Sequence, residues 1–337
     1  MKEALFFRKE EGGKVKCFLC NHYCNIENGQ LGICGVRLNR EGVLYSLNYA
    51  ELVAANIDPI EKKPLFHFFP GSSAYSIASI GCNFKCGFCQ NWQISQAKEA
   101  KELGIKTISV SAQEVVEAAV GHKCRSISYT YTEPTIYFEF AYDCAILAKE
   151  KGLYNNFVTN GYMSKEALRH ISPYLDAANV DLKSFREEFY RKICKAKLAP
   201  VLENIALMKE LGIWVELTTL IIPGENDSED ELSDIVSFIA SLDKNIPWHI
   251  SCFYPNYKFT NKSVTAASAL ETASLIGKEK GLKYVYIGNI HTDYGENTYC
   301  PSCSKLVIER LAFFIKRKDI KSGKCQYCGK KISGVGL

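Results

Sequence analysis

The apolar positions of the chain follow two alternating periods. Short runs of apolar, β-branched and aromatic residues predict strands, and the longer stretches between them have apolar residues three and four positions apart, as in amphipathic helices. The predicted strands are 75–81, 125–132, 154–159, 176–182, 213–222, 247–254 and 283–288, and the predicted helices are 112–120, 135–152, 164–175, 200–212 and 228–242. Ser164 and Ser228 stand at helix N-caps, and Gly152 and Gly212 stand where two helices end. The alternation predicts an α/β fold with parallel strands and crossover helices.

Six such βα units fit between residues 75 and 290, which favours a partial (β/α)6 TIM-like barrel or a full barrel. In such barrels the chemistry lies at the carboxyl ends of the strands, so the residues after each strand are candidates. They are Gly81-Cys82, Thr132-Glu133-Pro134, Thr159-Asn160-Gly161, Asp181-Leu182-Lys183, Pro223-Gly224-Glu225 and Gly288-Asn289. Each is an ordinary loop residue by itself. Taken together, these residues predict a functional site at the carboxyl ends of the strands.

Composition narrows the class of protein. With 337 residues, 47% hydrophobic and 23% charged, the chain does not match disordered, collagen-like or coiled-coil proteins. It contains no run of about 18 apolar residues, and acids occupy the start where a signal peptide needs an apolar stretch, so we expect a cytoplasmic protein without a membrane partner. The net charge is only +4, but residues 305–331 carry nine basic and two acidic side chains. This basic segment, together with the two CxxC pairs beside it, suggests a nucleic-acid-modifying or nucleic-acid-binding protein as the alternative function. We expect it less, because no RNA-binding module is recognisable and aromatic residues do not interleave with the basic ones.

The 15 cysteines are too many for ordinary packing, and disulfides are not expected in a reducing compartment, so metal binding is the leading explanation. Cys82, Cys86 and Cys89 follow a predicted strand directly. Three thiolates on one loop can hold three irons of a [4Fe–4S] cluster and leave the fourth iron open to a small molecule. A closed zinc site would recruit a fourth ligand, and no His or Cys occurs in the next thirty residues. Four further cysteines, Cys124, Cys144, Cys194 and Cys252, stand alone and are expected to be small buried hydrophobic residues.

This loop, GCNFKCGFCQNW (81–92), resembles the CxxxCxφC motif of the radical SAM superfamily, in which φ is aromatic and here is Phe88. The segments CQN (89–91), TNG (159–161), DLK (181–183) and IIPGEND (221–227) are similar to the branch related to pyruvate formate-lyase activating enzyme. DPIEKKPLFHFFPG (58–71), YTYTEPT (129–135), PWHISCFYP (247–255) and YVYIGN (284–289) look like the radical SAM enzyme of the AmmeMemoRadiSam system. The resemblance implies a radical SAM barrel.

The resemblance also implies an activity. The open iron would bind S-adenosylmethionine (SAM), and one electron would cleave SAM to methionine and a 5′-deoxyadenosyl radical that abstracts hydrogen from a substrate. The substrate class stays open between a peptide backbone, as for glycyl-radical activation, and a small metabolite. An electron donor such as ferredoxin or flavodoxin is implied, and Memo-like and AMMECR-like proteins are expected partners by family association.

Further residues receive roles through the resemblance. Glu133 corresponds to the acid of the family's GGE motif, which helps to hold the amino group of SAM, although Tyr131 and Thr132 replace the two glycines. Phe88 is expected near the adenine.

Asp181 and Lys183 are two positions apart at a strand end, so both can reach the carboxylate and ribose of SAM, or they form a surface ion pair. Asn160 and Thr218 or Thr219 are weaker candidates for such contacts. His249 is either a core histidine with a satisfied hydrogen bond or a contact to the sugar of SAM or to the substrate.

Two cysteine tetrads flank the central loop. The two CxxC pairs Cys300/Cys303 and Cys325/Cys328 predict a zinc-ribbon-like structural site, with an iron–sulfur cluster or a single iron ion as the alternative. The apolar residues of 308–315 are expected to supply its small core.

The N-terminal tetrad consists of Cys17, Cys20, Cys24 and Cys34. It predicts a second metal site, and zinc and an auxiliary [4Fe–4S] cluster both stay open. His22 is expected to be a loop residue rather than a ligand, since four cysteines suffice. The predicted organisation is an N-terminal Cys-rich segment over 1–70, a barrel over 71–292 and a metal-binding tail over 293–337.

Overall fold

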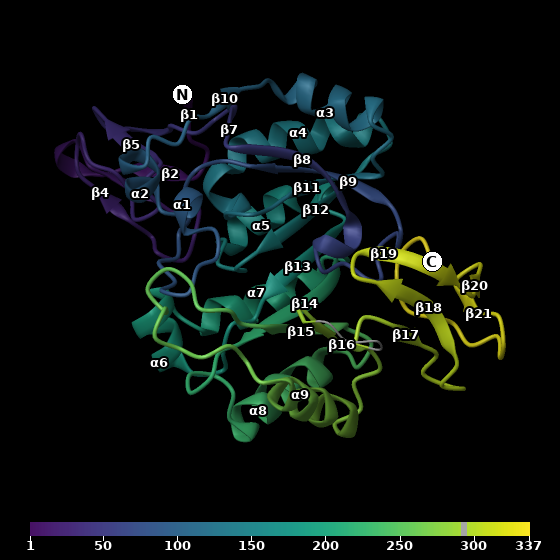
Figure 1. Ribbon diagram of the computed structural model, residues 1–337. Helices are drawn as coiled ribbons and strands as arrows, with labels where there is room; N and C mark the ends of the chain where they lie inside the picture. Colours follow the sequence, from purple (N-terminus) through teal and green to yellow (C-terminus); the bar gives the residue numbers. More distant parts are fainter. Residues whose placement is uncertain (291–294) are drawn as a thin grey trace.

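The computed structural model describes residues 1–290 and 295–337, and it is an α/β fold built on one curved sheet of eight strands (Figure 1). The strand order is β16-β15-β14-β13-β12-β11-β9-β8. The strands are β8 (Ala54–Pro59), β9 (Ser73–Ala78), β11 (Ser126–Tyr129), β12 (Tyr154–Thr159), β13 (Ala177–Asp181), β14 (Trp214–Ile221), β15 (Trp248–Cys252) and β16 (Val285–Gly288). All pairs are parallel except β8 with β9. The sheet order is linear, so in the described part of the chain the barrel is partial.

The seven predicted strands are confirmed, and β8 is an addition. Strand β8, Ala54–Pro59, was not predicted because its sequence lacks an apolar run. In the structure it lies at the sheet edge, where Asn56 and Ile57 are exposed. Its pairing with β9 places Asp58 beside the parallel strands.

Crossover helices join consecutive parallel strands and cover the outside of the sheet. They are α3 (Ala112–Gly121), α4 (Phe138–Glu150), α5 (Lys165–Ile171), α7 (Ala199–Glu210), α8 (Glu229–Leu242) and α9 (Ala267–Glu279). Figure 1 shows α3 and α4 at the β9 end and α8 and α9 at the β16 end. Short helices are α1 (Trp92–Ser95), α2 (Ala97–Glu102), α6 (Glu187–Phe189) and a π-helical turn, η5 (Tyr190–Cys194).

The local signals for helix ends are confirmed. The Ser164 and Ser228 side chains accept hydrogen bonds from the backbone N–H groups of Ala167 and Glu231 at the helix starts. Gly152 has a φ of +72° and Gly212 a φ of +78°, the left-handed conformation that stops a helix. The single helix predicted over 135–152 is wrong in one respect. Its first turn is a 3-10 helix, Pro134–Tyr137, before α4 begins at Phe138.

The N-terminal segment forms small antiparallel sheets against the barrel. They contain β1 (Lys2–Glu3), β6 (Val43–Ser46) and β5 (Arg37–Arg40); β2 (Phe7–Lys9), β3 (Val15–Cys17) and β4 (Asn25–Ile26); and β7 (Glu51–Leu52) with β10 (Ile108–Ser109). Buried residues of this segment, such as Val15 and Leu44, belong to the same hydrophobic core as the barrel helices. The boundary at residue 70 stays a prediction, and the main sheet already begins at β8.

The C-terminal tail holds β17 (Thr298–Tyr299), β18 (Leu306–Leu311), β19 (Phe314–Lys318), β20 (Ile320–Lys321) and β21 (Lys324–Cys325). The predicted boundary at 292 and 293 lies outside the described residues. The expectation that 308–315 supplies the tail's core is wrong beyond Ile308, because Phe314 is 68% exposed. The tail instead shares a small core with Phe66, Tyr284 and Tyr286 of the main body.

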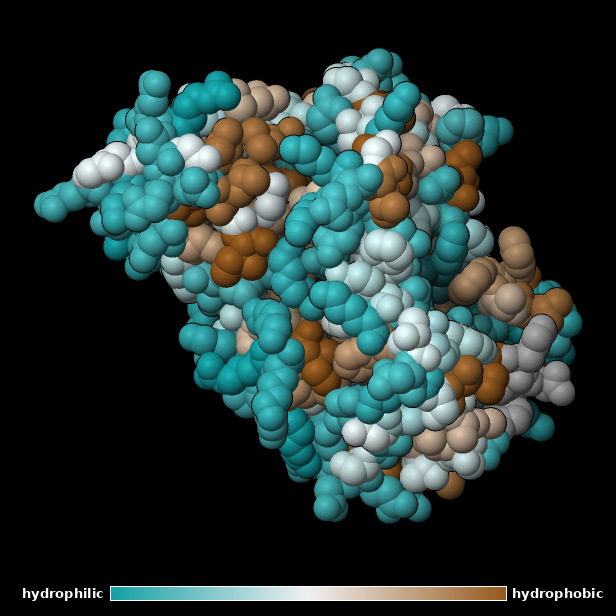
Figure 2. Space-filling view, turned by 60° about the vertical axis from the view of Figure 1, so that its left-hand side comes forward, coloured by the Kyte–Doolittle hydropathy of each residue, from teal (hydrophilic) through white to brown (hydrophobic). Residues whose placement is uncertain are grey.

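The surface turned forward in Figure 2 carries apolar groups separated by hydrophilic side chains. Within the described ranges, no helix has both the length and the apolar composition needed to cross a membrane.

Candidate active site

The central cysteines lie on the loop that leaves the carboxyl end of β9. Gly81, at the start of this loop, has a φ of +112°, and a Cβ there would stand 2.9 Å from Val36 Cγ1 and 3.2 Å from the Cys34 carbonyl oxygen. A side chain is therefore excluded at this point. Cys82 Sγ lies 3.3 Å from the Phe84 backbone nitrogen, which donates to it, and Cys89 Sγ lies 3.2 Å from Ser95 Oγ. The loop is folded tightly around its sulfur atoms.

One cavity of about 440 Å³ brings these cysteines together with the predicted strand-end residues. Its lining includes Cys82, Cys86, Phe88, Cys89, Glu133, Asn160, Asp181, Lys183 and Thr218. They meet because β9, β11, β12, β13 and β14 are parallel neighbours whose carboxyl ends share one edge. A separate cavity of about 170 Å³ contains His249 and shares Lys62, Thr218 and Ser251 with the first.

Glu133 is 1% exposed, and both of its carboxylate oxygens accept hydrogen bonds from within the protein. Its Oε1 accepts from Thr135 Oγ1 at 2.5 Å and Thr159 Oγ1 at 2.8 Å, and its Oε2 accepts from the Asn160 backbone N–H at 2.8 Å. Burial raises the pKa of the Glu133 carboxyl, and these donors oppose the shift. Oε2 keeps lone-pair capacity for one further donor in the cavity.

Asp181 and Lys183 form an ion pair, with Nζ 2.7 Å from Oδ2, inside the cavity. Burial lowers the pKa of the Lys183 ammonium, but Asp181 and the neighbouring thiols outweigh it and the net direction is upward. Lys183 Nζ lies 5.7 Å from the centre of the Phe88 ring. The pair is thus placed to present one cation and one anion beside an aromatic wall.

Sequence reasoning missed an ionic cluster at the edge of the same cavity. Asp58 accepts hydrogen bonds from Lys62 Nζ at 2.8 Å, from Lys63 Nζ at 2.7 Å and from the Tyr131 hydroxyl. Lys62, Lys63 and Tyr131 line the main cavity. Lys63 is 1% exposed, and burial lowers the pKa of its ammonium to about 8. These residues stand in the DPIEKK and YTYTEP segments, but nothing in the local sequence indicates that residue 58 contacts residue 131.

Tyr131, which the resemblance places where the family has a glycine, holds a φ of +62°. Asn91 Nδ2 donates to its carbonyl oxygen at 2.8 Å, and Lys63 Nζ stands 4.3 Å from the centre of its ring. These contacts hold a non-glycine residue in the left-handed region.

His249 Nε2 donates a hydrogen bond to Glu216 Oε2 at 2.7 Å, and the His249 ring stacks on Tyr286 with the ring centres 5.1 Å apart. Glu216 is fully buried and also accepts from the backbone N–H groups of Phe66 at 3.0 Å and His67 at 2.8 Å. Burial raises the pKa of Glu216, but its hydrogen-bond partners bring the net pKa below its usual value. His249 is therefore a hydrogen-bonded core residue that also lines the smaller cavity.

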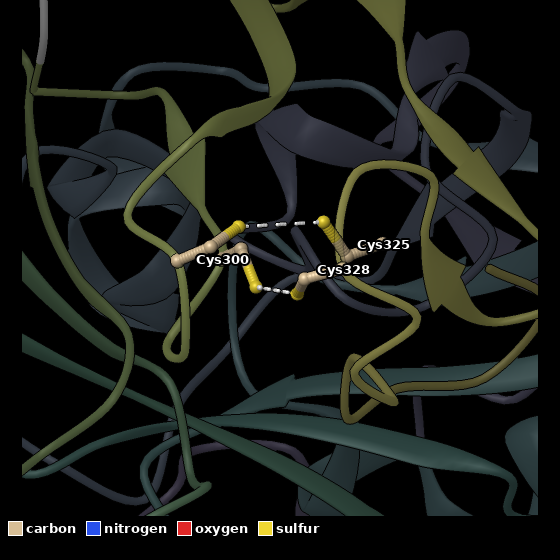
Figure 3. Close-up of side chains that lie close together, drawn as sticks. Cys300, Cys325 and Cys328 are labelled. Atoms are coloured by element: carbon tan, nitrogen blue, oxygen red, sulfur yellow. Dashed lines mark hydrogen bonds between the residues drawn. The ribbon is translucent and has the colours of Figure 1, made fainter.

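The C-terminal cysteines converge as the ligands of one ion would. Sγ–Sγ distances are 3.6 Å for Cys300 and Cys328 and 3.8 Å for Cys303 and Cys325, and all four sulfur atoms lie within 4.8 Å of one another. Figure 3 shows Cys300, after β17, facing Cys325 and Cys328. A tetrahedron with metal–sulfur bonds of about 2.3 Å has sulfur atoms roughly 3.8 Å apart. The donor set fits a single tetrahedral metal ion.

The N-terminal cysteines surround a cavity of about 20 Å³, also lined by His22, Arg37 and Asn83. The His22 side chain is not free to act as a further ligand beside these cysteines, since its Nε2 lies 2.8 Å from the Asn83 carbonyl oxygen.

Comparison with known proteins gives a family and relatives. Residues 76–236 match the model described as the radical SAM superfamily. The chain is 47% identical to an uncharacterised protein of Methanocaldococcus jannaschii over 99% of this chain and all of that protein. It is 28% identical to a protein of the same organism named as a glycyl-radical enzyme activating enzyme, over 64% of this chain and 79% of that one.

Solved structures share the fold. Streptococcus suis SuiB bound to S-adenosylmethionine superposes with a TM-score of 0.52 at 15% identity, covering 72% of this chain and 56% of that one. A radical SAM methyltransferase from Sphaerobacter thermophilus gives 0.50 at 16% identity, covering 71% of each chain. These two matches show the fold of the chain.

Proposed function

Because the chain belongs to the radical SAM superfamily, we propose that it cleaves SAM reductively to a 5′-deoxyadenosyl radical and abstracts a hydrogen atom from its substrate. The observation that carries this proposal is the 440 Å³ cavity, which places three cysteines of one loop among the charged strand-end residues. The proposed reaction needs both groups of residues. The cysteines would bind iron, and the charged strand-end residues would bind the amino-acid part of SAM.

The donor set fits a [4Fe–4S] cluster with one open iron. Cys82, Cys86 and Cys89 come from one loop and face one cavity. When bound, the cluster supplies one low-potential electron and an iron site for the amino and carboxylate groups of SAM. Phe84 and Ser95, which are 1% and 2% exposed, line the cavity beside these cysteines.

The chain's own residues would hold and orient SAM. Glu133 Oε2 has capacity left for the amino group. Lys183 can bond the carboxylate and Asp181 a ribose hydroxyl, exchanging their mutual ion pair for two charge-assisted hydrogen bonds to the ligand. Phe88 supplies an apolar wall for the adenine, and Asn160 and Thr218 offer polar contacts at neighbouring strand ends.

The substrate stays open between a peptide backbone and a small metabolite. The relative named as a glycyl-radical enzyme activating enzyme supports the first. Lys62 and Lys63 on the wall of the cavity support a substrate with an anionic group in either class. Ferredoxin or flavodoxin as donor, Memo-like and AMMECR-like partners and a cytoplasmic location stay predictions.

For the C-terminal tetrad we propose a structural zinc ion. The short sulfur distances support a single ion, and the tail has too small a core of its own to fold without a crosslink.

The test is SAM cleavage by anaerobically reconstituted protein. With dithionite and SAM, the wild type should release 5′-deoxyadenosine, and Cys86→Ala should not, because the cluster would lose one of its three cysteine ligands. Cys124→Ala is the matched control, since Cys124 is buried but absent from the cavity. Retained activity in Cys86→Ala would contradict the assignment.

A further inference from the structure

A second cavity adjoins the proposed SAM site. It has a volume of about 170 Å³ and shares Lys62, Thr218 and Ser251 with the larger cavity, so a molecule bound in it would lie beside SAM. One water needs roughly 10–15 Å³ of such space, and the cavity therefore has room for roughly a dozen water-sized groups. This size fits a small molecule rather than a folded peptide loop.

The C-terminal tail and the main body build the wall of this cavity together. Phe66 and Tyr286 of the main body and Phe313, from the turn between β18 and β19, line it. The centre of the Phe66 ring lies 4.7 Å from that of His249 and 4.8 Å from that of Tyr286. Arg310 of β18 joins the two parts, since its Nη2 donates to the Phe66 carbonyl oxygen at 2.9 Å. Polar groups among these aromatic rings bind a ligand more strongly than they would in water.

His249 lines this cavity and has one ring nitrogen that the protein leaves unpaired. Its Nε2 donates to Glu216, which also accepts from two backbone N–H groups and, at 3.0 Å, from Trp214 Nε1. Burial raises the pKa of the Glu216 carboxyl, but these partners bring it below its usual value, so Glu216 is an ionised acceptor and keeps the imidazole proton on Nε2. In the neutral ring Nδ1 is then an acceptor, and it has no hydrogen-bond partner among residues 1–290 and 295–337.

Glu61 adds a second unpaired acceptor. It lines the same cavity, is 1% exposed, and has an Oε2 atom that meets no donor in the described part of the chain. Its other oxygen, Oε1, accepts from the Gly71 backbone N–H at 2.9 Å and lies 3.7 Å from Arg310 Nε. Buried acceptors are normally paired, so Glu61 and His249 together favour a ligand that donates hydrogen bonds.

Lys62 places a positive charge where the two cavities meet. Lys62 and Lys63 both donate to Asp58, at 2.8 Å and 2.7 Å, and the Tyr131 hydroxyl donates to the same carboxylate. Two ammonium groups thus face one carboxylate, which leaves one positive charge uncompensated within this cluster when both lysines carry a proton. Because Lys62 lines both cavities, an anionic group of a ligand can pair with it.

We propose that this smaller cavity binds the substrate, and that the substrate is a small organic anion whose carboxylate or phosphate pairs with Lys62 and whose hydroxyl or amino group donates to His249 Nδ1. This chemistry selects a small metabolite over a peptide backbone. That the bound molecule loses a hydrogen atom to the 5′-deoxyadenosyl radical rests on the proposed function, whereas its binding does not.

Ligand-observed NMR titration of the reconstituted full-length protein, with SAM and without a reductant, tests the binding. The probes are glycerate, serine, which has an amino group in place of the 2-hydroxyl, and glycerol 3-phosphate, which has a phosphate in place of the carboxylate. At least one should bind about tenfold or more tightly than propionate, which lacks the donors, and than glycerol, which lacks the anion. The probe that binds most tightly identifies the preferred anionic and donor groups. Failure of all three to bind, or equal binding of propionate, would overturn the proposal.

Two variants locate the ligand in the cavity. Lys62→Met should weaken binding of the tightest probe and of propionate alike, by about tenfold or more, because both anions lose their charged partner. His249→Gln, whose amide can still donate to Glu216, should weaken binding of the tightest probe about fivefold or more but that of propionate less than about twofold, because propionate has no group that donates to Nδ1. Lys98→Met and His122→Gln, which change exposed residues outside both cavities, are the matched controls and should alter neither constant. Equal losses for the two ligands in His249→Gln, or no loss in either site variant, would overturn the proposal.

Substrate binding needs no reductant, so it is measured independently of SAM cleavage. If the probes bind as stated but the wild type releases no 5′-deoxyadenosine with dithionite, the proposed function fails and the binding site stands. If SAM is cleaved but no probe binds, the binding site fails and the proposed function stands.

Discussion

Arg37 and Glu139 form a buried bidentate ion pair that joins the N-terminal segment to α4. Nη1 lies 3.1 Å from Oε1 and Nη2 lies 2.6 Å from Oε2, and both residues are 1% exposed. Glu139 Oε1 also accepts from the Leu5 backbone N–H at 2.9 Å. This one carboxylate therefore joins two parts of the N-terminal segment to the barrel helix α4.

The first prediction concerns this carboxylate. Glu139→Gln leaves the Arg37 cation buried without a counter-charge, which typically costs about 3–5 kcal/mol. Urea denaturation should show a loss of this order in the free energy of unfolding. Glu150→Gln, on the exposed face of the same helix, should change it by less than about 0.5 kcal/mol. Equal stability of both variants would mean that the ion pair does not hold the segment in place.

Elements with a strong periodic pattern could be predicted from the sequence, and those defined by tertiary contacts could not. The parallel strands are buried runs, so their residues carry the signal. Helix α9 went unpredicted because Ala267–Glu279 is rich in alanine and serine, which mark a helix only weakly by apolar spacing. The tail's core was misplaced because its apolar partners, Phe66 and Tyr286, lie elsewhere in the chain.

The candidate site likewise contains residues that could be predicted from the sequence and residues that could not. The cysteine loop and the strand-end residues have fixed spacings, which the resemblance could place on the sequence. The cluster of Asp58, Lys63 and Tyr131 could not be predicted, because it needs β8 to pair with β9 and a tyrosine to adopt a positive φ. The contact of His22 with Asn83 is equally non-local.

The second prediction tests the residues that would hold SAM. Asp181→Ala and Lys183→Ala should each weaken SAM binding tenfold or more, since a charge-assisted hydrogen bond contributes about 1.5–3 kcal/mol. The iron–sulfur absorbance should be unchanged because neither side chain ligates iron. Glu188→Ala breaks an exposed ion pair with Lys192 nearby and should leave the dissociation constant as it is. An unchanged constant in both site variants would reduce Asp181 and Lys183 to a structural ion pair.

The third prediction concerns the buried lysine. Burial lowers the pKa of Lys63 to about 8 from 10.5, so between these values the unfolded chain binds more protons than the folded one. The folded state should therefore gain about 3 kcal/mol relative to the unfolded state as pH rises from about 8 to 10.5, as a shift of this size implies. The gain is absent below pH 8, where both states carry the proton.

Lys63→Met separates this effect from other titrations. The free energy of unfolding of wild type minus that of the variant should rise between pH 7.5 and 10, measured by urea denaturation at each pH. Lys62→Met, which removes an exposed lysine bound to the same carboxylate, is the control and should show a smaller pH dependence. A flat difference for Lys63→Met would show that the Lys63 ammonium is not destabilised by burial.

The last prediction concerns the C-terminal metal. Cys325→Ser removes one of four ligands from a closed site, so the chain should lose one zinc and the tail should exchange backbone amides faster, because metal binding and local folding are coupled. Hydrogen exchange over residues 295–337 measures this, and SAM cleavage by the catalytic cavity should persist, since the tail does not line it. Cys252→Ser, a buried cysteine away from the tail, should keep the zinc. Detection of iron with a reducible cluster spectrum at this site would contradict the structural zinc and would indicate an electron carrier. The spacing of about 3.6–3.8 Å between paired sulfur atoms argues against that outcome.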